Sequence, residues 1–329
     1  MKAVRFDAFG EPGQVLRVAE VPEPVPGPGE VLVRMIASPV NPSDLLVVRG
    51  RYGVLPPLPA TPGFEGVGVV EDSGPGLLGR FYRGRRVAVI NQEGGNWAEK
   101  VVLPALRVVP VPPDLPDDQV ASFFVNPATA LALTRHVLRV PKGAWLLQTA
   151  AGSTLGRMII KLGRHDGFRT MNVVRRPEAV DELKALGADA VICSADAPID
   201  EQVRSLTGGQ GVAHAIDPVG GEAGSQVFRA LAEDARMVVY GLLSDEPIRF
   251  DPRAMIAGKR VIEGFWLGHW MQSRNKLKAV ALFREIAGLI RSGVLASDPG
   301  RTFPLDAILD AAREADSVGR RGKTLLTPS

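Results

Sequence analysis

Residues 145–156 read WLLQTAAGSTLG: a short apolar run, a loop of small residues and the beginning of a helical pattern. The run predicts a buried strand, and the apolar spacing after the loop predicts a helix over about 155–162. Glycines in such a turn let the backbone approach a pyrophosphate, which the helix N-terminus then binds. Gly152 and Gly156 fit that pattern, with Thr154 where a middle glycine is expected. A plain strand–helix turn explains the same residues equally well.

The strand that follows favours a nucleotide site. Thr170–Val174 is predicted as a strand, and Arg175 and Arg176 stand at its end. An NAD-specific site places Asp or Glu there, about 20 residues beyond the glycines, to bind the ribose hydroxyls. Guanidinium groups instead bind phosphate in a bidentate manner, so the pair predicts the 2′-phosphate of NADPH rather than NADH. The alternative is that the two arginines are only solvated side chains at the beginning of a helix. The loop, the spacing and the positive charge together favour a phosphate site.

Strand and helix patterns alternate around this loop, with about 30 residues in each unit. The predicted strands are 145–148, 170–174, 190–192, 212–216 and 237–240. Pro177 stands at a plausible first helical position, and Gly187 closes the helix that it begins. An apolar helical stretch, Asn126–Leu138, precedes the first strand. The alternation predicts a doubly wound parallel sheet.

The chain before residue 123 has a different character, because it is rich in Pro, Gly and Val and its apolar segments are short. Strands are predicted at 31–36, 67–70 and 86–90. Turn residues separate them, which favours a mostly antiparallel, barrel-like domain. A long helix is predicted at about 276–292, and the short segments after it are expected to return to the first domain. The expected domains are residues 1–122 with 273–329, and residues 123–272.

The composition is that of a soluble globular protein, with 329 residues, 45% hydrophobic and 23% charged. The net charge is only +3, and the basic residues are scattered, which argues against a nucleic-acid groove. No apolar run approaches the roughly 18 residues of a membrane span. Met1–Phe6 has the alternation of a strand rather than the pattern of a leader. We therefore expect a cytoplasmic protein without nucleic-acid or membrane partners.

Metal-binding side chains are few. The single cysteine, Cys193, excludes an internal disulfide and a cysteine-rich zinc site, and is expected to be a small buried residue at a strand end. The four histidines are His136, His165, His214 and His269, and no two stand at ligand spacing. Any hydride chemistry is therefore expected to be metal-free, with full activity in protein that contains no stoichiometric zinc by elemental analysis.

Short motifs along nearly the whole chain resemble those of the medium-chain dehydrogenase/reductase superfamily, in its zinc-independent part. The motifs are Asn41-Pro42-Ser43-Asp44, Gly50-Arg51-Tyr52-Gly53, Gly63-Phe64-Glu65-Gly66, Asn126-Pro127-Ala128-Thr129-Ala130, Asn172-Val173-Val174-Arg175-Arg176-Pro177, Tyr240-Gly241, Gly264-Phe265-Trp266-Leu267 and Gly322-Lys323. Phe64 holds the place of a histidine in the zinc branch. The best match is to mitochondrial-type 2-enoyl thioester reductases, with quinone oxidoreductases next. The resemblance implies a GroES-like catalytic domain and a Rossmann cofactor domain.

The resemblance also implies roles for individual residues. Tyr52 matches a tyrosine of the catalytic cleft. Contacts to NADPH are implied for Asn126, Gly152, Ser153, Thr154, Leu155, Gly156, Arg175, Arg176, Tyr240, Gly241, Leu242, Leu243, Phe265, Trp266, Leu267, Gly268 and Lys323. Two departures leave questions open. Thr154 replaces a glycine usual in the loop, and the two site arginines are adjacent here, so which of them meets the phosphate is undecided.

Structural roles are the alternatives for several of these residues. They are a surface loop aromatic for Tyr52, helix capping for Asn126, packing for Trp266 and Trp270, turn capping for Asp44, and a structural carboxylate for Glu65. Against these alternatives, Tyr52 is kept as the leading catalytic candidate and the others as cofactor contacts.

The implied reaction is NADPH-dependent reduction of the C2=C3 bond of a trans-2-enoyl thioester of CoA or acyl carrier protein, in fatty acid metabolism. Hydride goes to the β-carbon, and negative charge develops on the thioester oxygen as an enolate. Tyr52 is expected to donate to that oxygen or to protonate the α-carbon. A quinone oxidoreductase, which needs no Tyr52, and a non-catalytic NADPH-binding sensor are the alternatives; the missing ligands disfavour a zinc alcohol dehydrogenase. A homodimer is expected because relatives often form one.

Overall fold

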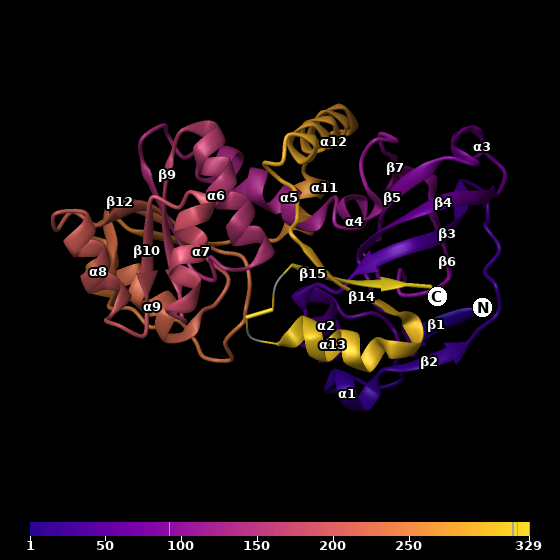
Figure 1. Cartoon of the computed structure of the whole chain (residues 1–329), viewed down its shortest axis with the longest axis horizontal. Helices are drawn as coiled ribbons and strands as arrows, with labels where there is room; N and C mark the ends of the chain where they lie inside the picture. The colour runs from indigo at the N-terminus through magenta and orange to yellow at the C-terminus, as the bar shows by residue number, and fades with distance from the viewer. Residues whose placement is uncertain (92, 318, 321, 329) are drawn as a thin grey trace. The chain divides into compact units, whose positions relative to one another are not determined.

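The computed structural model describes residues 1–91, 93–317, 319–320 and 322–328 (Figure 1). The chain forms two compact units. Unit 1 is Met1–Val125 with Val280–Ser329, and unit 2 is Asn126–Ala279. The first boundary between the units follows Val125 and the second follows Ala279. Both lie a few residues beyond the domain boundaries expected after residues 122 and 272.

The described part of unit 1 is mainly β-structure. Its strands are β1 (Lys2–Arg5), β2 (Arg17–Glu20), β3 (Glu30–Pro39), β4 (Glu65–Ser73), β5 (Arg86–Ile90), β6 (Lys100–Pro104), β7 (Val108–Pro110), β14 (Pro299–Pro304) and β15 (Lys323–Thr327). Its helical segments are α1 (Pro12–Val15), α2 (Pro42–Val48), α3 (Leu77–Tyr82), η1 (Ala105–Arg107), α4 (Asp117–Ala121), η3 (Leu305–Ala307) and α13 (Ile308–Asp316).

The strands of unit 1 form one large sheet and one small one. The seven-stranded sheet has the order β14-β15-β3-β4-β5-β7, with β6 also paired to β3, and β1 pairs with β2. These pairs are antiparallel except for β14 with β15, which confirms the mostly antiparallel architecture. In β15, Leu326 pairs with Ser38 of β3, so the C-terminal segments do return to the first domain.

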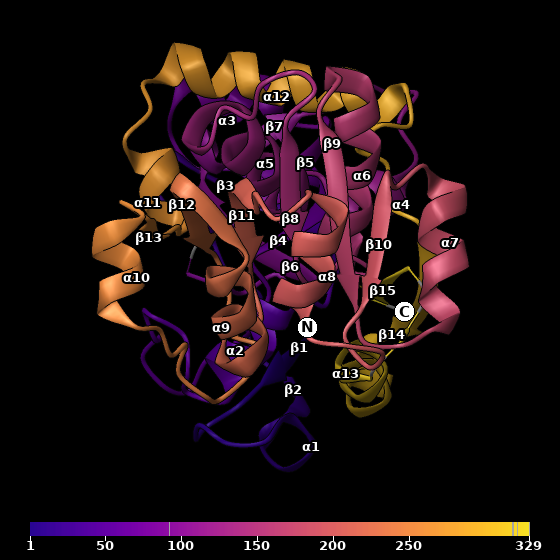
Figure 2. The same ribbon diagram turned by 90° about the vertical axis from the view of Figure 1, so that its left-hand side faces the viewer.

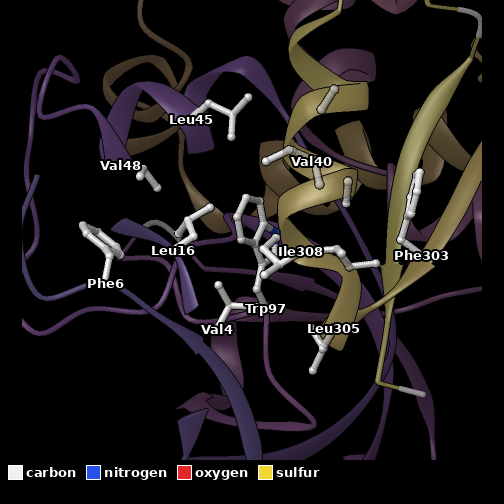
Figure 3. Close-up of a cluster of buried hydrophobic side chains, with 14 of the residues drawn as sticks. Val4, Phe6, Leu16, Val40, Leu45, Val48, Trp97, Phe303, Leu305 and Ile308 are labelled. Carbon is white, nitrogen blue, oxygen red and sulfur yellow. The ribbon is translucent and has the colours of Figure 1, made fainter. Parts of the chain in front are cut away.

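A core of unit 1 surrounds Trp97, which is fully buried (Figure 3). Its indole N–H donates to the carbonyl oxygen of Pro39 at 3.1 Å, so the ring is buried with its donor satisfied. Gly63 lies against this ring with φ +106°, and a Cβ there would stand 2.5 Å from Trp97 Cδ1. A glycine is therefore required at this point, and it fixes the course of the chain into Phe64 and Glu65.

Unit 2 alternates strands and helices. Its strands are β8 (Trp145–Gln148), β9 (Arg169–Val174), β10 (Ala190–Cys193), β11 (Val212–Asp217), β12 (Leu231–Val239) and β13 (Val261–Gly264). Its helices are α5 (Val125–Leu131), the π-helix η2 (Ala132–Val137), α6 (Thr154–Asp166), α7 (Glu178–Leu186), α8 (Ile199–Leu206), α9 (Gly221–Arg229), α10 (Pro252–Ala257) and α11 (Leu267–Gln272). The long helix α12 (Lys276–Arg291) follows.

The sheet of unit 2 is parallel throughout, in the order β10-β9-β8-β11-β12-β13. Numbered along the chain this is 3-2-1-4-5-6, the order of dinucleotide-binding folds, and the predicted doubly wound sheet is confirmed. Helix α6 packs beside α7, and α8 beside α9 (Figure 2). Because all strands run the same way, their carboxyl ends meet at one edge, and ligands of such sheets bind where the order reverses, here between β8 and β11.

Candidate active site

The loop between β8 and α6 has the form of an anion site. Ser153 caps α6, and its hydroxyl oxygen accepts the N–H of Gly156 at 3.1 Å. Gly152 and Ser153 are exposed, and Thr154 begins the helix. The first N–H groups of a helix have no acceptor within the helix, and they form the positive end of its dipole. The loop can therefore bind a phosphate with backbone groups, whatever side chain stands at Thr154.

The two glycines of this loop do different work. A Cβ on Gly156 would stand 2.5 Å from the carbonyl oxygen of Ala151, a backbone atom that cannot move aside easily. A Cβ on Gly152 would meet nothing within 4 Å. Gly156 is therefore needed for close packing of α6 on the end of β8, while Gly152 leaves space beside the loop.

We expect Gly156→Ala to destabilise the protein by roughly 1–3 kcal/mol, because overpacking against backbone outweighs the better helix propensity of alanine. The measurement is the midpoint of chemical denaturation. Gly152→Ala is the matched control and should leave the midpoint almost unchanged. Equal midpoints for the two variants would contradict this account of the loop.

The carboxyl end of β9 is basic and open. Arg175 and Arg176 follow the strand directly and are exposed. Neither forms an ion pair with another residue in the described part of the chain. The first carboxylate after the strand is that of Glu178, in the first turn of α7. Both guanidinium groups are thus available to a phosphate.

A buried aspartate joins the two strands at which the sheet order reverses. Asp217, at the end of β11, is fully buried. Its carboxylate accepts the hydroxyl of Thr149, which follows β8, and the N–H groups of Val219 at 3.0 Å and Gly220 at 2.8 Å. These bonds hold together the loops that follow β8 and β11. Asp217 was not among the residues predicted from the sequence, although an acidic residue that ends an apolar strand before Pro-Val-Gly-Gly is a signal of a shaped loop.

A pocket of about 660 Å³ lies at the ends of β12 and β13. It is lined by Val239, Tyr240, Gly241, Gly264, Phe265, Trp266, His269 and Trp270. Of the expected cofactor contacts, Tyr240, Gly241, Phe265 and Trp266 come together here; Leu242 and Leu243 are exposed beside them. Leu267 and Gly268 open α11, which follows Trp266. His269 was not among the expected contacts.

Tyr240 lines this pocket and is fixed through its backbone. Its backbone N–H donates to the carbonyl oxygen of Asp217 at 3.1 Å. Burial raises the pKa of its hydroxyl above the ordinary value, and the charge of Asp217 raises it further. The phenol is therefore protonated at every physiological pH.

The two tryptophans of the pocket are surface aromatics rather than core residues. The rings of Trp266 and His269 lie 4.4 Å apart, and Trp270 lies 6.2 Å from Phe265. The guanidinium of Arg274 stacks on Trp270 at 3.7 Å. Both tryptophans contact the pocket, so their spacing of four residues brings them to one side of a binding surface.

Tyr52 lies in unit 1, in the turn that follows α2. Its ring packs on Phe64 with 5.3 Å between ring centroids and an interplanar angle of 39°. Both rings are half-buried against the Trp97 core. Phe64 precedes Glu65, the first residue of β4, so the tyrosine is anchored at the beginning of that strand.

Next to Phe64, the ring partner of Tyr52, lies a buried network of polar and charged groups. The Asp44 carboxylate accepts the N–H of Asn41 at 2.8 Å and that of Phe64 at 3.1 Å, which confirms a capping role for Asp44. Glu65 accepts the side-chain amide of Asn41 at 3.0 Å. Lys323 is buried, and its ammonium donates to the side-chain oxygen of Asn41. The expected cofactor contact Lys323 is thus engaged within unit 1.

Glu65 also supports the beginning of α5. Its second carboxylate oxygen accepts the N–H groups of Phe124 at 3.0 Å and Val125 at 2.8 Å. Capping by Asn126, the structural alternative to a cofactor contact, does not fit the structure: the helix begins at Val125, with Asn126 in its first turn. A carboxylate distant in sequence binds the leading N–H groups instead. Asn126 itself is half-buried.

Burial shifts the pKa values of this network. It raises the pKa of Asp44 to about 7, although hydrogen bonds from the Asn41 backbone and the charge of Lys323 oppose the shift. It also raises the pKa of Glu65. Burial lowers the pKa of Lys323 to about 8, against the carboxylates of Glu65 and Asp44.

The raised pKa of Asp44 predicts a pH effect on stability. Between pH 3.8 and about 7, folded Asp44 keeps a proton that the unfolded chain releases, so its stabilising contribution is lost as the pH rises through this window. Asp44→Asn cannot titrate. The free energy of unfolding of the wild type, relative to Asp44→Asn, should therefore fall by a few kcal/mol from pH 4 to pH 7. A constant difference between the two proteins would contradict the assignment. Asp306→Asn, which breaks an exposed ion pair with Lys2, is the control.

The described residues offer few ligands to a metal. In that part of the chain, no three His, Cys, Asp or Glu side chains form a group that could hold an ion. Cys193 is buried at the end of β10, as expected. Among the described helices, none has the length and apolar character needed to cross a membrane.

Comparisons with known proteins agree with this architecture. Residues 27–113 match the family "Alcohol dehydrogenase GroES-like domain", and residues 154–283 match "Zinc-binding dehydrogenase". The mitochondrial enoyl-[acyl-carrier-protein] reductase of Xenopus tropicalis is 32% identical over 98% of this chain and 93% of its own length.

Solved structures give the same result. A quinone oxidoreductase from Pseudomonas syringae superposes with a TM-score of 0.91 and 26% identity, covering 99% of both chains. A mycobacterial structure complexed with NADPH superposes with a TM-score of 0.90 and 29% identity, covering all of both chains. The chain therefore belongs to the medium-chain dehydrogenase/reductase superfamily of oxidoreductases, and it is similar to the mitochondrial enoyl-[acyl-carrier-protein] reductases within it.

Proposed function

We propose that the protein reduces the C2=C3 double bond of trans-2-enoyl thioesters with NADPH. The observation that carries this proposal is the 32% identity with a mitochondrial enoyl-[acyl-carrier-protein] reductase over nearly the whole chain. It is supported by the phenol of Tyr52, which is packed on Phe64 at the beginning of β4. The acyl group is carried by CoA or by acyl carrier protein.

The cofactor is assigned to the carboxyl edge of the unit 2 sheet. The pyrophosphate is held by the α6 N-terminus and the loop from Gly152 to Gly156, and the 2′-phosphate by Arg175 or Arg176. The segments Tyr240–Leu243 and Phe265–Gly268, with Asn126, line the remainder of the cofactor site. NADPH bound there supplies the hydride that reaches the β-carbon of the substrate.

We assign Tyr52 a role at the thioester oxygen of the substrate. When the β-carbon is reduced, negative charge develops on the thioester oxygen, and a fixed hydroxyl lowers the energy of that charge. The Tyr52 hydroxyl donates a hydrogen bond to this oxygen or delivers the proton to the α-carbon. Lys323, whose ammonium is bound to Asn41, remains a proposed contact near the cofactor.

A quinone reductase is the second candidate, favoured by the similarity to quinone oxidoreductase structures. It uses the same cofactor residues and needs no donor at Tyr52. A non-catalytic NADPH sensor is a third reading of the same nucleotide loop. NADPH oxidation measured side by side with crotonyl-CoA and with a quinone separates the three. We expect turnover with crotonyl-CoA; turnover with the quinone alone, or with neither, would overturn the proposal.

We also propose a homodimer. Strand β13 pairs on one side only, with β12, and stands at the edge of the unit 2 sheet. Val261 in this strand and Ile256 in α10 are exposed apolar residues. An unpaired edge with apolar neighbours favours association of two copies. Sedimentation of the purified protein at twice the chain mass is the expected result.

A further inference from the structure

Exposed apolar and basic side chains gather at the turn between β4 and β5, far along the sheet from Tyr52. They belong to α3, to the turn after it and to η1, which contacts α3. The apolar members are Leu77, Leu78, Phe81 and Leu106, and the basic members are the exposed Arg80, Arg83 and Arg85 with the half-buried Arg107. We name these eight residues the α3 patch. Leu77 is 88% exposed and Leu106 67% exposed, so these side chains stand almost wholly in solvent.

The packing of α3 explains why its apolar side chains point outward. Gly79 faces the sheet, because a Cβ there would stand 2.9 Å from Ser73 Cβ and 3.3 Å from the carbonyl oxygen of Glu30. Tyr82, three residues further, packs against the buried valines of that sheet. One face of this short helix is thus fixed on unit 1, whereas the side chains of Leu77 and Phe81 are exposed; Figure 1 shows α3 at the end of the β4 strand.

The surroundings of the α3 patch carry an excess of positive charge. Between Asp72 and Glu93 the chain contains four arginines and no acidic residue; one of the four, Arg86, lies outside the α3 patch and is paired with Asp117 at 2.7 Å. Arg83 is 3.6 Å from Asp72, and Arg107 is 3.0 Å from Glu93. Arg85 stacks on the ring of Phe81 at 3.8 Å. In the described part of the chain, Arg80 has no carboxylate partner.

We propose that the α3 patch docks the protein on anionic lipid membranes. Protruding Leu and Phe side chains insert among acyl chains, while neighbouring arginines bind lipid phosphates and carboxylates. Lipid adapts to such side chains, whereas a protein partner needs a complementary surface of about 800 Å² on each side, far more than a six-residue helix offers. A second copy of the same patch is repelled by its arginines.

The position of the patch suits this role. Strand β4 runs from Glu65, beside Phe64 and Tyr52, to Ser73, and α3 begins four residues later at Leu77. Nine strand residues separate the two ends by about 30 Å, so contact through α3 leaves the region around Tyr52 open. No membrane partner was expected from the sequence, because no apolar run is long enough to span a bilayer; a surface contact needs no such run. The proposal does not depend on the reaction proposed above.

Sedimentation of the full-length protein with vesicles tests the proposal. We expect binding to vesicles of phosphatidylcholine with phosphatidylserine, weak binding to phosphatidylcholine alone, and weakening by salt because charges are screened. Arg80→Gln with Arg85→Gln should lower the partition coefficient about 25-fold, at roughly fivefold per arginine. Leu77→Ser with Phe81→Ser should lower it at least about tenfold, since two apolar side chains no longer insert.

Matched controls separate the patch from general surface effects. Val25→Ser with Leu206→Ser removes exposed apolar groups elsewhere, and Arg253→Gln with Arg313→Gln removes exposed arginines; both should bind as the wild type does. Thermal midpoints show that every variant is folded. Equal binding of wild type and patch variants, or no binding to anionic vesicles, would overturn the proposal. So would loss of binding to a purified acidic acyl carrier protein in patch variants that still bind vesicles, because the partner is then a protein.

Discussion

Tyr52→Phe lowers kcat for crotonyl-CoA by about 10²–10³-fold, the usual loss when one donor to a developing oxyanion is removed. The substitution keeps the ring that packs on Phe64 and removes only the hydroxyl. The loss falls on kcat more than on KM, because the bond to the oxygen matters most in the transition state. Steady-state kinetics, together with a fluorescence titration of NADPH, measure both effects. NADPH affinity should be nearly unchanged.

Tyr82→Phe is the matched control for this variant. Tyr82 is another half-buried tyrosine of unit 1, packed against the valine-rich core of the sheet rather than against Phe64. Its loss of a hydroxyl should leave kcat within about twofold of the wild type. Wild-type turnover in Tyr52→Phe would remove Tyr52 from the mechanism and favour the quinone reductase, whose chemistry needs no such donor.

Replacing both Arg175 and Arg176 by Ala should raise KM for NADPH by about 10²-fold and leave KM for NADH almost unchanged. The reason is the loss of charge-assisted hydrogen bonds to the 2′-phosphate, each worth about 1.5–3 kcal/mol, which NADH does not have. KM for the two cofactors, measured in parallel, gives the answer. The two single variants show which of the adjacent arginines meets the phosphate.

Arg169→Ala is the control for the arginine pair. Arg169 begins β9, at the opposite end of the strand from Arg175, where its guanidinium stacks on Trp145. Its removal should affect NADPH and NADH equally. A double variant of Arg175 and Arg176 that loses both cofactors to the same degree would contradict the assignment of the phosphate site.

The nucleotide-binding half of the chain was predictable because its signals are local. Strand β8 has the predicted bounds, and β9, β10 and β11 differ from prediction by a residue at an end. Each is a buried apolar run between loops of Gly, Ser or Pro, so the pattern alone marks it. The loop from Gly152 to Gly156 follows the first such run, and its role could be inferred from residues that are neighbours in sequence.

The last two strands of that sheet were harder to see. Strand β13 is a run of four residues, Val261–Gly264, exposed at both ends, and it is a strand because β12 lies beside it. Strand β12 begins at Leu231, earlier than the predicted 237–240, through a polar segment in which Asp234 has φ +54°. Such a segment has no strand pattern of its own: Leu231 and Arg236 pair with Val212 and His214 of β11, and the residues between them form an irregularity in that pairing.

The contacts that shape the site join residues far apart in sequence, and no local pattern reveals them. The Glu65 carboxylate accepts the N–H of Val125, and the Lys323 ammonium donates to the side-chain oxygen of Asn41. Thr149 is bonded to Asp217 across two strands. These bonds depend on tertiary structure, which is why helix capping by Asn126 stood as an alternative and why Asp217 was missed. The α3 patch escaped notice because exposure, unlike composition, is a property of the fold.

The measurement that tests the central claim most directly is the fate of the transferred hydrogen. The protein is incubated with crotonyl-CoA and NADPH that carries deuterium at the transferred position of C4, and the product is examined by mass spectrometry and NMR. The account predicts butyryl-CoA with one deuterium on its β-carbon, a solvent proton on its α-carbon, and one NADPH consumed per product. Crotonyl-CoA recovered unchanged while the same protein oxidises NADPH with a quinone would contradict it.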